Sequence, residues 1–380
     1  MSTNRKNRRE FLKSSLGSAA TVALAGSTRR LPRSQATSPA ARPGRIRFAA
    51  IGLNHSHING QVETVIRGGG QLVSFFAKEP DLAGAFAKRF PDAKLARSER
   101  EILEDPAIQL VVSAAVPDER APLGIEVMRH GKDFMVDKPA ATTLEQVADV
   151  RRVQARTKRI FSVLIERLES KSINKAGDLV RAGAIGRVIQ TVGLAPHRMN
   201  PETRAPWFFE RERYGGVLCD LASHNIDSFL FLTGSTRADI VASQVGNVHH
   251  PQYPGLEDFG DVMLNGDGGG GYIRVDWLSP AGLTTYGDGR LTILGTEGYI
   301  ELRKTVDIAG RPGGNHLFLV DQKGARYVDC SDVPLPYAER LVDDIVNRTT
   351  TSDSQTRTFL AMELALEAEK QARRIPPQSR

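Results

Sequence analysis

Cysteine is nearly absent from this sequence of 380 residues, which contains only Cys219 and Cys330. Two thiols cannot build a disulfide framework or a zinc ribbon, so small disulfide-rich folds are excluded. Aromatic residues make up only 6%, and no apolar stretch reaches the length of a bilayer span. The 40% of hydrophobic and 25% of charged residues are typical of a globular protein with two domains.

A shortage of acidic residues gives the chain a net charge of +7, but the excess is local. Residues 1–45 contain ten basic residues and one acid, which leaves 41 basic and 43 acidic residues in 46–380. Because this remaining body is nearly neutral, we expect no nucleic-acid partner.

The N-terminal segment resembles a twin-arginine export signal. Arg8 and Arg9 form the pair, residues 11–13 read Phe-Leu-Lys, and the weakly apolar stretch 16–26 contains a small-residue cleavage site at 23–25. The resemblance implies recognition by the twin-arginine export machinery, a periplasmic location and a mature protein without an integral membrane span.

From Ile46 onwards, short apolar runs alternate with amphipathic stretches, which is typical of a parallel sheet with crossover helices. The pattern predicts strands at 46–51, 71–77, 110–115, 133–136 and 159–164, and helices at 57–67, 81–90, 120–130 and 143–157. This order predicts an α/β Rossmann dinucleotide-binding domain, in which ligands lie beyond the carboxyl ends of the strands.

The second half of the chain predicts an α+β domain with a large, open-faced and mainly antiparallel sheet, because several of its runs alternate apolar and polar residues. The expected helices are 174–182, 218–232, 336–347 and 354–374, and the expected strands are 186–193, 239–245, 258–264, 271–277, 290–295 and 299–303. The predicted organisation is a signal peptide at 1–25, a disordered linker at 26–44, a Rossmann domain at 45–164 and a domain for substrate binding and oligomerisation at 165–375. An open sheet face also predicts a homodimer or homotetramer.

The first turn of the predicted Rossmann domain lacks two of the three glycines of the Gly-x-Gly-x-x-Gly pattern. Gly52 is present, whereas Asn54 and either Ser56 or His57 occupy the other positions. Asparagine tolerates a left-handed turn and can donate to phosphate, so Gly52, Asn54, His55, Ser56 and His57 are candidates for cofactor binding. An ordinary strand-to-helix turn is the alternative. We expect no metal at His55 and His57, because no carboxylate or thiolate stands near them in the sequence.

A carboxylate usually binds the ribose at the end of the second Rossmann strand, but this sequence has Ala77 and Lys78 there. The lysine favours NADP over NAD, although Glu79 could turn inward and oppose that preference. We also expect Val116 and Pro117, which follow the third predicted strand, to contact the cofactor.

Two further groups of residues could carry chemistry. Asp137 and Lys138 follow a buried strand, so the lysine is expected to point into the ligand crevice and bind a substrate hydroxyl and the nicotinamide ribose. Asp220, His224 and Asp227 are spaced i, i+4 and i+7, which predicts a shared helix face. Histidine can take a proton near neutral pH, and a neighbouring carboxylate can orient it. A solvated lysine and a surface network are the structural alternatives.

The sequence DKP, followed about 80 residues later by GGVLCDLASHNID, resembles the glucose-fructose oxidoreductase, inositol dehydrogenase and rhizopine-catabolism family, or Gfo/Idh/MocA. The resemblance covers nearly the whole chain after the N-terminal segment. It implies that Lys138 is the active-site lysine, that Asp220 and His224 are the acid and general base of a second motif, and that Arg167 lines the substrate pocket. Asp137 replaces the glutamate that is usual in the family.

This resemblance implies reversible hydride transfer between a sugar or cyclitol hydroxyl and a nicotinamide cofactor. His224 would take the hydroxyl proton, Lys138 would bind the same oxygen, and Asp220 would orient the substrate ring. Aromatic residues that could stack on the apolar face of a sugar are Trp207, Phe208, Trp277 and Tyr286.

Two other functions fit the same residues. An exported member of the family could cleave glycosides with a tightly bound NAD that is oxidised and re-reduced in each turnover, because the periplasm holds no pool of soluble cofactor. A non-enzymatic sugar-binding or assembly protein is the second alternative, and the altered glycine turn favours it.

Overall fold

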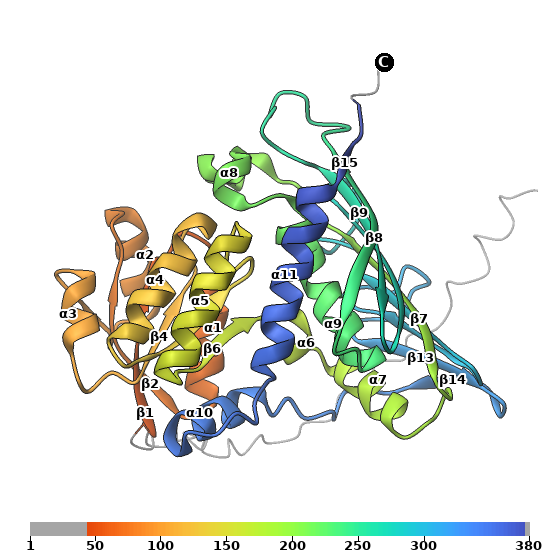
Figure 1. The fold of residues 1–380 in the computed structure, drawn as a ribbon, viewed down its shortest axis with the longest axis horizontal. Coiled ribbons are helices and arrows are strands. Elements are labelled where there is room, and N and C mark those ends of the chain that lie inside the picture. Colours follow the sequence, from red (N-terminus) through yellow and green to blue (C-terminus); the bar gives the residue numbers. More distant parts are fainter. Residues whose placement is uncertain (1–43, 377–380) are drawn as a thin grey trace, which may run out of the picture. The chain divides into compact units, whose positions relative to one another are not determined.

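The computed structural model describes residues 44–376, which form two sheets (Figure 1). The first sheet has six parallel strands in the order β3-β2-β1-β4-β5-β6, which is the Rossmann order. Its strands are β1 (Ile46–Ile51), β2 (Gly70–Phe76), β3 (Lys94–Leu95), β4 (Leu110–Ser113), β5 (Asp133–Asp137) and β6 (Phe161–Leu164). The predicted signal peptide and all but the last residue of the predicted linker lie outside the described residues.

The helices of this part of the chain alternate with its strands, as the sequence predicts. They are α1 (His57–Arg67), α2 (Pro80–Arg89), α3 (Glu99–Glu104), α4 (Pro117–Arg129) and α5 (Leu144–Thr157). Strands β4 and β5 are buried at every position, because a parallel sheet has helices on both faces. Their apolar runs therefore end at the edge of the sheet where Asp137 and Lys138 emerge.

The second sheet has nine strands in the order β14-β13-β12-β11-β7-β10-β9-β8-β15. Its strands are β7 (Val188–Pro196), β8 (Ala238–Gly246), β9 (Phe259–Gly266), β10 (Gly269–Asp276), β11 (Arg290–Gly295), β12 (Tyr299–Arg303), β13 (His316–Asp321), β14 (Gly324–Val328) and β15 (Arg373–Arg374). Strand β10 runs parallel to β7 and β15 parallel to β8, and all other neighbours are antiparallel. The predicted fold class is confirmed.

Helices cover one face of this second sheet (Figure 1). The helical segments after β6 are α6 (Glu166–Glu169), α7 (Lys171–Arg181), the 3₁₀ turns η1 (Pro201–Thr203) and η2 (Pro206–Phe209), α8 (Arg211–Tyr214), the π-helical segment η3 (Leu218–Ala222), α9 (Ser223–Thr233), α10 (Tyr337–Asn347) and α11 (Gln355–Gln371). The chain enters α9 through η3 without a break, so the predicted helix 218–232 exists but begins with a widened turn.

Four strands escape the sequence prediction. Strands β3 and β15 are two residues long, which is too short for any periodicity, and β13 reads as a continuous apolar run. Strand β14 is exposed along most of its length, so its residues do not alternate in character. Strands β9 and β10 form a hairpin, because Gly266 pairs with Gly269 across a two-residue turn.

Helix α11 contacts both halves of the structure. It packs against α5 and β6 of the Rossmann part, and against α9, η3 and β8 of the second part (Figure 1). The two halves therefore share one continuous hydrophobic core. Within residues 44–376, no helix is long and apolar enough to cross a membrane.

Candidate active site

A cavity of about 360 Å³ lies where the end of β5 faces η3 and α9. It is the place where the predicted lysine, acid and histidine meet. Its polar lining residues are His55, Ser56, His57, Lys138, Glu166, His197, Arg198, Asn200, Arg204, Asp220, His224, Asn225, Tyr286 and Lys304. Phe208 and Trp277 add apolar surface. The cavity is thus polar, rich in nitrogen and bordered by two aromatic rings.

Lys138 is held at the centre of this site by Asp220. The Nζ of Lys138 donates to Oδ1 of Asp220 at 2.5 Å and to its backbone oxygen at 2.9 Å. Both side chains are nearly buried. Although burial alone would raise it, the Lys138 ammonium holds the pKa of Asp220 below its ordinary value. The site therefore contains a desolvated ion pair.

Arg120 holds the backbone at Lys138 in place. No sequence pattern had indicated this residue. Its guanidinium is fully buried and donates to the backbone oxygens of Ala115, Lys138 and Pro139. It also forms an ion pair with Asp137 at 3.1 Å. Arg120 thus ties the ends of β4 and β5 together, and the Lys138–Pro139 peptide bond beside it is cis.

His224 meets a hydrogen-bond donor at Nδ1. The backbone N–H of Glu166 donates to this atom at 3.1 Å, so the proton of the neutral ring lies on Nε2. Burial, together with the positive charges of Lys138 and Lys304, holds the pKa of His224 well below its ordinary value. His224 therefore offers the cavity a hydrogen-bond donor, whereas a general base would need the other tautomer.

Asp220 lies in η3, whereas His224 and Asp227 lie on α9. Asp220 and His224 line the cavity, but Asp227 binds Arg167 and Arg357. Arg167 also forms an ion pair with Asp353 at 2.8 Å and is buried. The structure does not bring Arg167 into the cavity, because two carboxylates on α9 and before α11 hold it elsewhere.

The turn after β1 lies between two cavities. His55, Ser56 and His57 border the cavity described above, while Gly52 and Asn54 border a second one of about 380 Å³. Gly52 has a φ of +74°, and a Cβ there would come within 2.5 Å of the Cβ of Ala115. Ser56 makes no side-chain cap, and the first N–H groups of α1 bind within the turn: those of His57 and Ile58 donate to Nδ1 and the backbone oxygen of His55, and that of Asn59 to the backbone oxygen of Ser56. The close approach at Gly52 and the cavities on both sides of the turn fit a dinucleotide that crosses it.

The second cavity is acidic. It is lined by Gly52, Asn54, Ala77, Lys78, Glu79, Glu99, Asp118, Glu119 and Glu126, among others. Glu79 faces inward and accepts a hydrogen bond from Nδ2 of Asn54 at 2.8 Å. Lys78 also lines this cavity, but it is exposed and pairs with Glu119, another lining residue. The sequence has no carboxylate at the usual position at the end of β2. Glu79, two residues after Ala77, places one in this cavity.

His55, His57 and Asp137 form a cluster whose ligand atoms lie within 4.8 Å of one another. Burial lowers the pKa of His55 to about 3, so its ring is neutral. His57 lies 3.0 Å from Asp137, and Arg120 already pairs with the same carboxylate. Two fixed cations, Arg120 and Lys138, disfavour a metal ion at this point, since they would repel it.

Some of the other predicted site residues line neither of the two cavities. Val116 and Pro117 begin α4 and are buried, and neither lines the two cavities. Trp207 lies beside His55, with ring centroids 6.4 Å apart, but it does not line the substrate cavity. Phe208, Trp277 and Tyr286 do line it.

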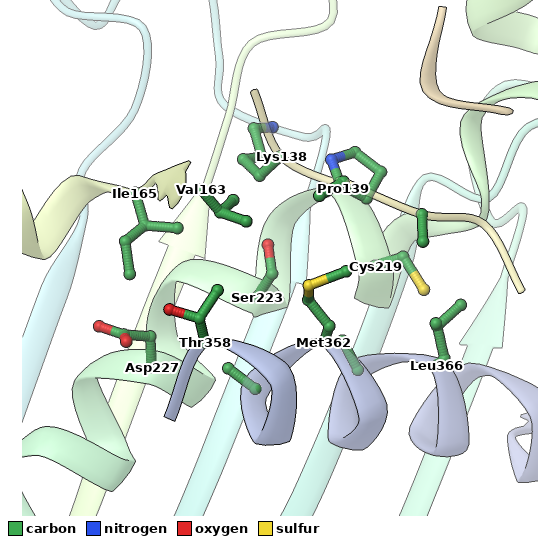
Figure 2. A pocket seen from close by; sticks show the side chains of 14 residues that line it. Lys138, Pro139, Val163, Ile165, Cys219, Ser223, Asp227, Thr358, Met362 and Leu366 are labelled. Atoms are coloured by element: carbon green, nitrogen blue, oxygen red, sulfur yellow. The ribbon is translucent and has the colours of Figure 1, made fainter. Parts of the chain in front are cut away.

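A smaller cavity of about 30 Å³ lies behind Lys138, between β6, η3 and α11 (Figure 2). Apolar side chains such as Val163, Met362 and Leu366 surround it, and Ser223 faces it with a hydroxyl that has no hydrogen-bond partner among the described residues. This volume is too small for a sugar or a nucleotide. The cavity therefore belongs to the packing between the two halves.

Two family profiles match most of the described part of the chain. Residues 46–165 match the profile described as "Oxidoreductase family, NAD-binding Rossmann fold", and residues 173–301 match the "GFO/IDH/MocA C-terminal domain". The levoglucosan dehydrogenase of Pseudarthrobacter phenanthrenivorans is 26% identical over 52% of this chain and 51% of its own length. The 1,5-anhydro-D-fructose reductase of Ensifer adhaerens is 27% identical over 52% of this chain and 58% of its own. The chain thus spans about half the length of these curated relatives.

Solved structures agree over the described part of the chain. A crystal structure from Erwinia carotovora atroseptica, described as that of an oxidoreductase, has 44% identity and a TM-score of 0.85, covering 87% of this chain and 100% of that one. Levoglucosan dehydrogenase in complex with NADH and levoglucosan has a TM-score of 0.72 at 18% identity, over 86% of this chain and 98% of that one. At that identity, the second match shows the fold alone.

Proposed function

Because this chain belongs to the Gfo/Idh/MocA family of oxidoreductases and carries its NAD(P)-binding Rossmann domain, we propose that it transfers a hydride between a hydroxyl carbon of a sugar or cyclitol and a nicotinamide cofactor. The observation that carries the proposal is the Lys138–Asp220 ion pair, which shares one cavity with His224 at the carboxyl ends of the Rossmann strands. Relatives named as dehydrogenases and reductases of sugars and inositols support the substrate class.

Oxidation of a carbinol removes a hydride from carbon and a proton from oxygen. Nicotinamide, when bound, supplies the hydride acceptor. Lys138 is placed to receive the hydroxyl proton, because it can pass one of its own protons to Oδ1 of Asp220, 2.5 Å away. His224 donates from Nε2 to the same substrate oxygen and stabilises the negative charge that develops there. In the reverse direction the same donor polarises the carbonyl group.

The charge of the second cavity supports NAD rather than NADP, contrary to the preference that the sequence favoured. Glu79 is oriented toward Asn54 at the end of β2, where a carboxylate can accept hydrogen bonds from the two ribose hydroxyls. A 2′-phosphate there would meet Glu79 and the neighbouring Glu99 and Glu126. The residues that would hold the dinucleotide are Gly52, Asn54, Ser56, His57, Glu79 and Lys138.

The proposal is tested by mass spectrometry and isotope transfer. Nucleotide released from the purified, denatured protein identifies a bound cofactor, and NAD⁺ is then added with levoglucosan, scyllo-inositol or D-xylose labelled with deuterium at each carbinol carbon. Deuterium recovered in NADH supports hydride transfer, whereas an oxidised product formed without any label in the cofactor contradicts it. Free sugar without net NADH formation would instead identify the glycoside-cleaving alternative, which no observation on the described residues favours.

We also infer export of the folded enzyme by the twin-arginine route, which the Arg8–Arg9 pair and its apolar continuation support. Residues 1–44 fused to a fluorescent reporter should direct it to the periplasm. The double substitution Arg8→Lys and Arg9→Lys should keep the reporter inside the cell, and equal export of both fusions would contradict this route.

Self-association through the uncovered face of the second sheet is the last part of the proposal. Val241, Met263, Leu294 and Tyr299 are 41–58% exposed there, the first two on the adjacent strands β8 and β9 and the last two on the adjacent strands β11 and β12. Exposed apolar side chains on an uncovered sheet face are typical of an interface between copies.

A further inference from the structure

The cavity at Lys138 contains more positive than negative side chains. Its cations are Lys138, Arg198, Arg204 and Lys304, and its anions are Glu166 and Asp220. Asp220 neutralises Lys138 at 2.5 Å, and Glu166 neutralises Lys304 at 2.6 Å. The two arginines remain without a carboxylate within 4.0 Å among the described residues, so the lining as a whole carries an unbalanced positive charge.

Arg198 and Arg204 differ in what their guanidinium groups meet. Arg198 directs one terminal nitrogen at the backbone oxygens of Pro280, Leu283 and Thr285, so it holds the loop between β10 and β11. Arg204 makes one hydrogen bond, from Nε to the backbone oxygen of Met199 at 3.0 Å. Both terminal nitrogens of Arg204 lack a partner in the described part of the chain.

Two aromatic rings fix the position of the Arg204 guanidinium. Its Cζ lies 4.5 Å from the ring centre of Phe208 and 4.9 Å from that of Trp277. These rings are themselves buried and contact each other edge to face at 5.2 Å. An arginine held in this way presents a rigid, planar pair of donors, which matches the geometry of a carboxylate.

Other buried or anchored arginines have more partners than Arg204. Arg120, Arg167 and Arg211 each pair with at least one carboxylate, and Arg198, which has none, donates to three backbone oxygens. Burial lowers the pKa of Arg204, which reflects the cost of desolvating a charge without a partner. An anionic ligand would offset that cost.

We propose that the substrate is an anionic sugar, a uronic or aldonic acid whose carboxylate binds the terminal nitrogens of Arg204 in a bidentate manner while the reacting hydroxyl contacts Lys138 and His224. The inference rests on the proposed hydride transfer and specifies its substrate class. Asp220 and Arg204 line the same cavity of about 360 Å³, so both groups can contact one small ligand. The diphosphate of the cofactor is the other possible source of the anion, and the experiment separates the two.

The test uses the full-length protein saturated with NADH and compares matched pairs of ligands by calorimetry. The pairs are glucose with glucuronate, galactose with galacturonate, and mannose with mannuronate, and the uncharged methyl esters of the three acids serve as ligands of equal size. Variants Arg204→Met and Arg204→Lys are measured beside Arg187→Met, which removes an exposed guanidinium outside the cavity. Oxidation of each compound with NAD⁺ is followed in parallel.

We expect at least one uronate to bind 10- to 150-fold more tightly than its neutral partner and its ester, as charged hydrogen bonds typically contribute. Arg204→Met should abolish this preference and leave binding of the neutral sugar within threefold, Arg204→Lys should restore part of it, and Arg187→Met should bind like the wild type. Binding of NADH should be equal in all four proteins.

Several results would overturn the inference. These are equal affinity for acids and neutral sugars, a preference that survives in Arg204→Met, a complete absence of uronate binding, or a loss of NADH affinity in Arg204→Met, which would assign the arginine to the diphosphate. If neutral sugars are oxidised while uronates are not, the anionic class is wrong and hydride transfer stands. If NADH does not bind and nothing is oxidised, the proposed function falls as well.

Discussion

His224 differs from a histidine base in the group that its Nδ1 contacts. The backbone N–H of Glu166 occupies that nitrogen, so only Nε2–H is available to a ligand. We therefore expect His224→Gln, whose amide can still donate, to retain about tenfold more activity than His224→Ala, which should lose about 10²–10³-fold in kcat. The measurement is kcat over pH 5.5–9. Equal activity of the two variants would return His224 to the role of a base.

At the same scale, we expect the preference between NAD and NADP to depend on Glu79. Glu79→Gln should weaken NAD⁺ binding by roughly tenfold, because the charge-assisted hydrogen bonds to the ribose hydroxyls are lost. NADP⁺ binding should improve, since one negative charge near the 2′-phosphate is removed. Fluorescence titration with both cofactors measures the ratio. An unchanged ratio would show that Glu79 acts only on Asn54.

The residues of the site differ in how well the sequence could reveal them. Lys138, Asp220 and His224 follow from strand ends, helix spacing and the family motif, and the structure brings them to one cavity. Arg204 carries no local signal, because its function depends on rings 4 and 73 positions away that only the fold places around it. Arg167 was expected in the pocket, but its carboxylate partner Asp353 is 186 residues distant.

At the level of elements, the helix that bears Asp220 and His224 is held at its start by two buried glutamates. Glu257 accepts the backbone N–H of Val217 at 3.0 Å, and Glu369 accepts that of Leu218 at 3.0 Å. Burial and the nearby charge of Glu257 raise the pKa of Glu369 to about 8. Glu257, just before β9, and Glu369 of α11 thus hold the start of η3 in position.

This pair predicts a pH-dependent stability. Between about pH 4.5 and 8 the folded chain keeps a proton on Glu369 that the unfolded chain loses, so the free energy of unfolding should fall as pH rises, by at most about 1.4 kcal/mol per unit. Glu369→Gln should flatten this slope, because glutamine resembles the protonated acid. Urea unfolding at pH 5, 6.5 and 8 measures it, with the exposed Glu339→Gln as control. Parallel slopes for Glu369→Gln and the wild type would show that Glu369 does not cause the pH dependence of the free energy of unfolding.

The alternation of strands and helices was readable in the Rossmann part, because parallel strands are continuous apolar runs and their helices are amphipathic. The widened turn η3 could not be predicted. A π-helical segment depends on the groups that hydrogen-bond to its backbone rather than on the periodicity of its own residues. This turn nevertheless carries Asp220, which lines the cavity together with His224 of α9.

At the scale of the whole molecule, we propose that copies of the chain associate through the uncovered sheet face. Val241→Glu together with Met263→Glu places two charges on adjacent strands of that face, so the assembly should dissociate into monomers. Light scattering coupled to size-exclusion chromatography gives the mass. Lys88→Glu on α2, far from the second sheet in sequence and exposed, is the control. A mass unchanged by the double substitution would locate the interface elsewhere.

Helix α11 has a consequence for the order in which the molecule can be made. It is translated after every predicted catalytic residue, yet it packs against α5 and β6, and its Glu369 binds the start of the helical segment that carries Asp220. A nascent chain that has synthesised every predicted catalytic residue but not α11 still lacks this support. The active site is therefore completed only after translation of α11, so a chain terminated before this helix contains the chemistry in its sequence without being able to assemble it.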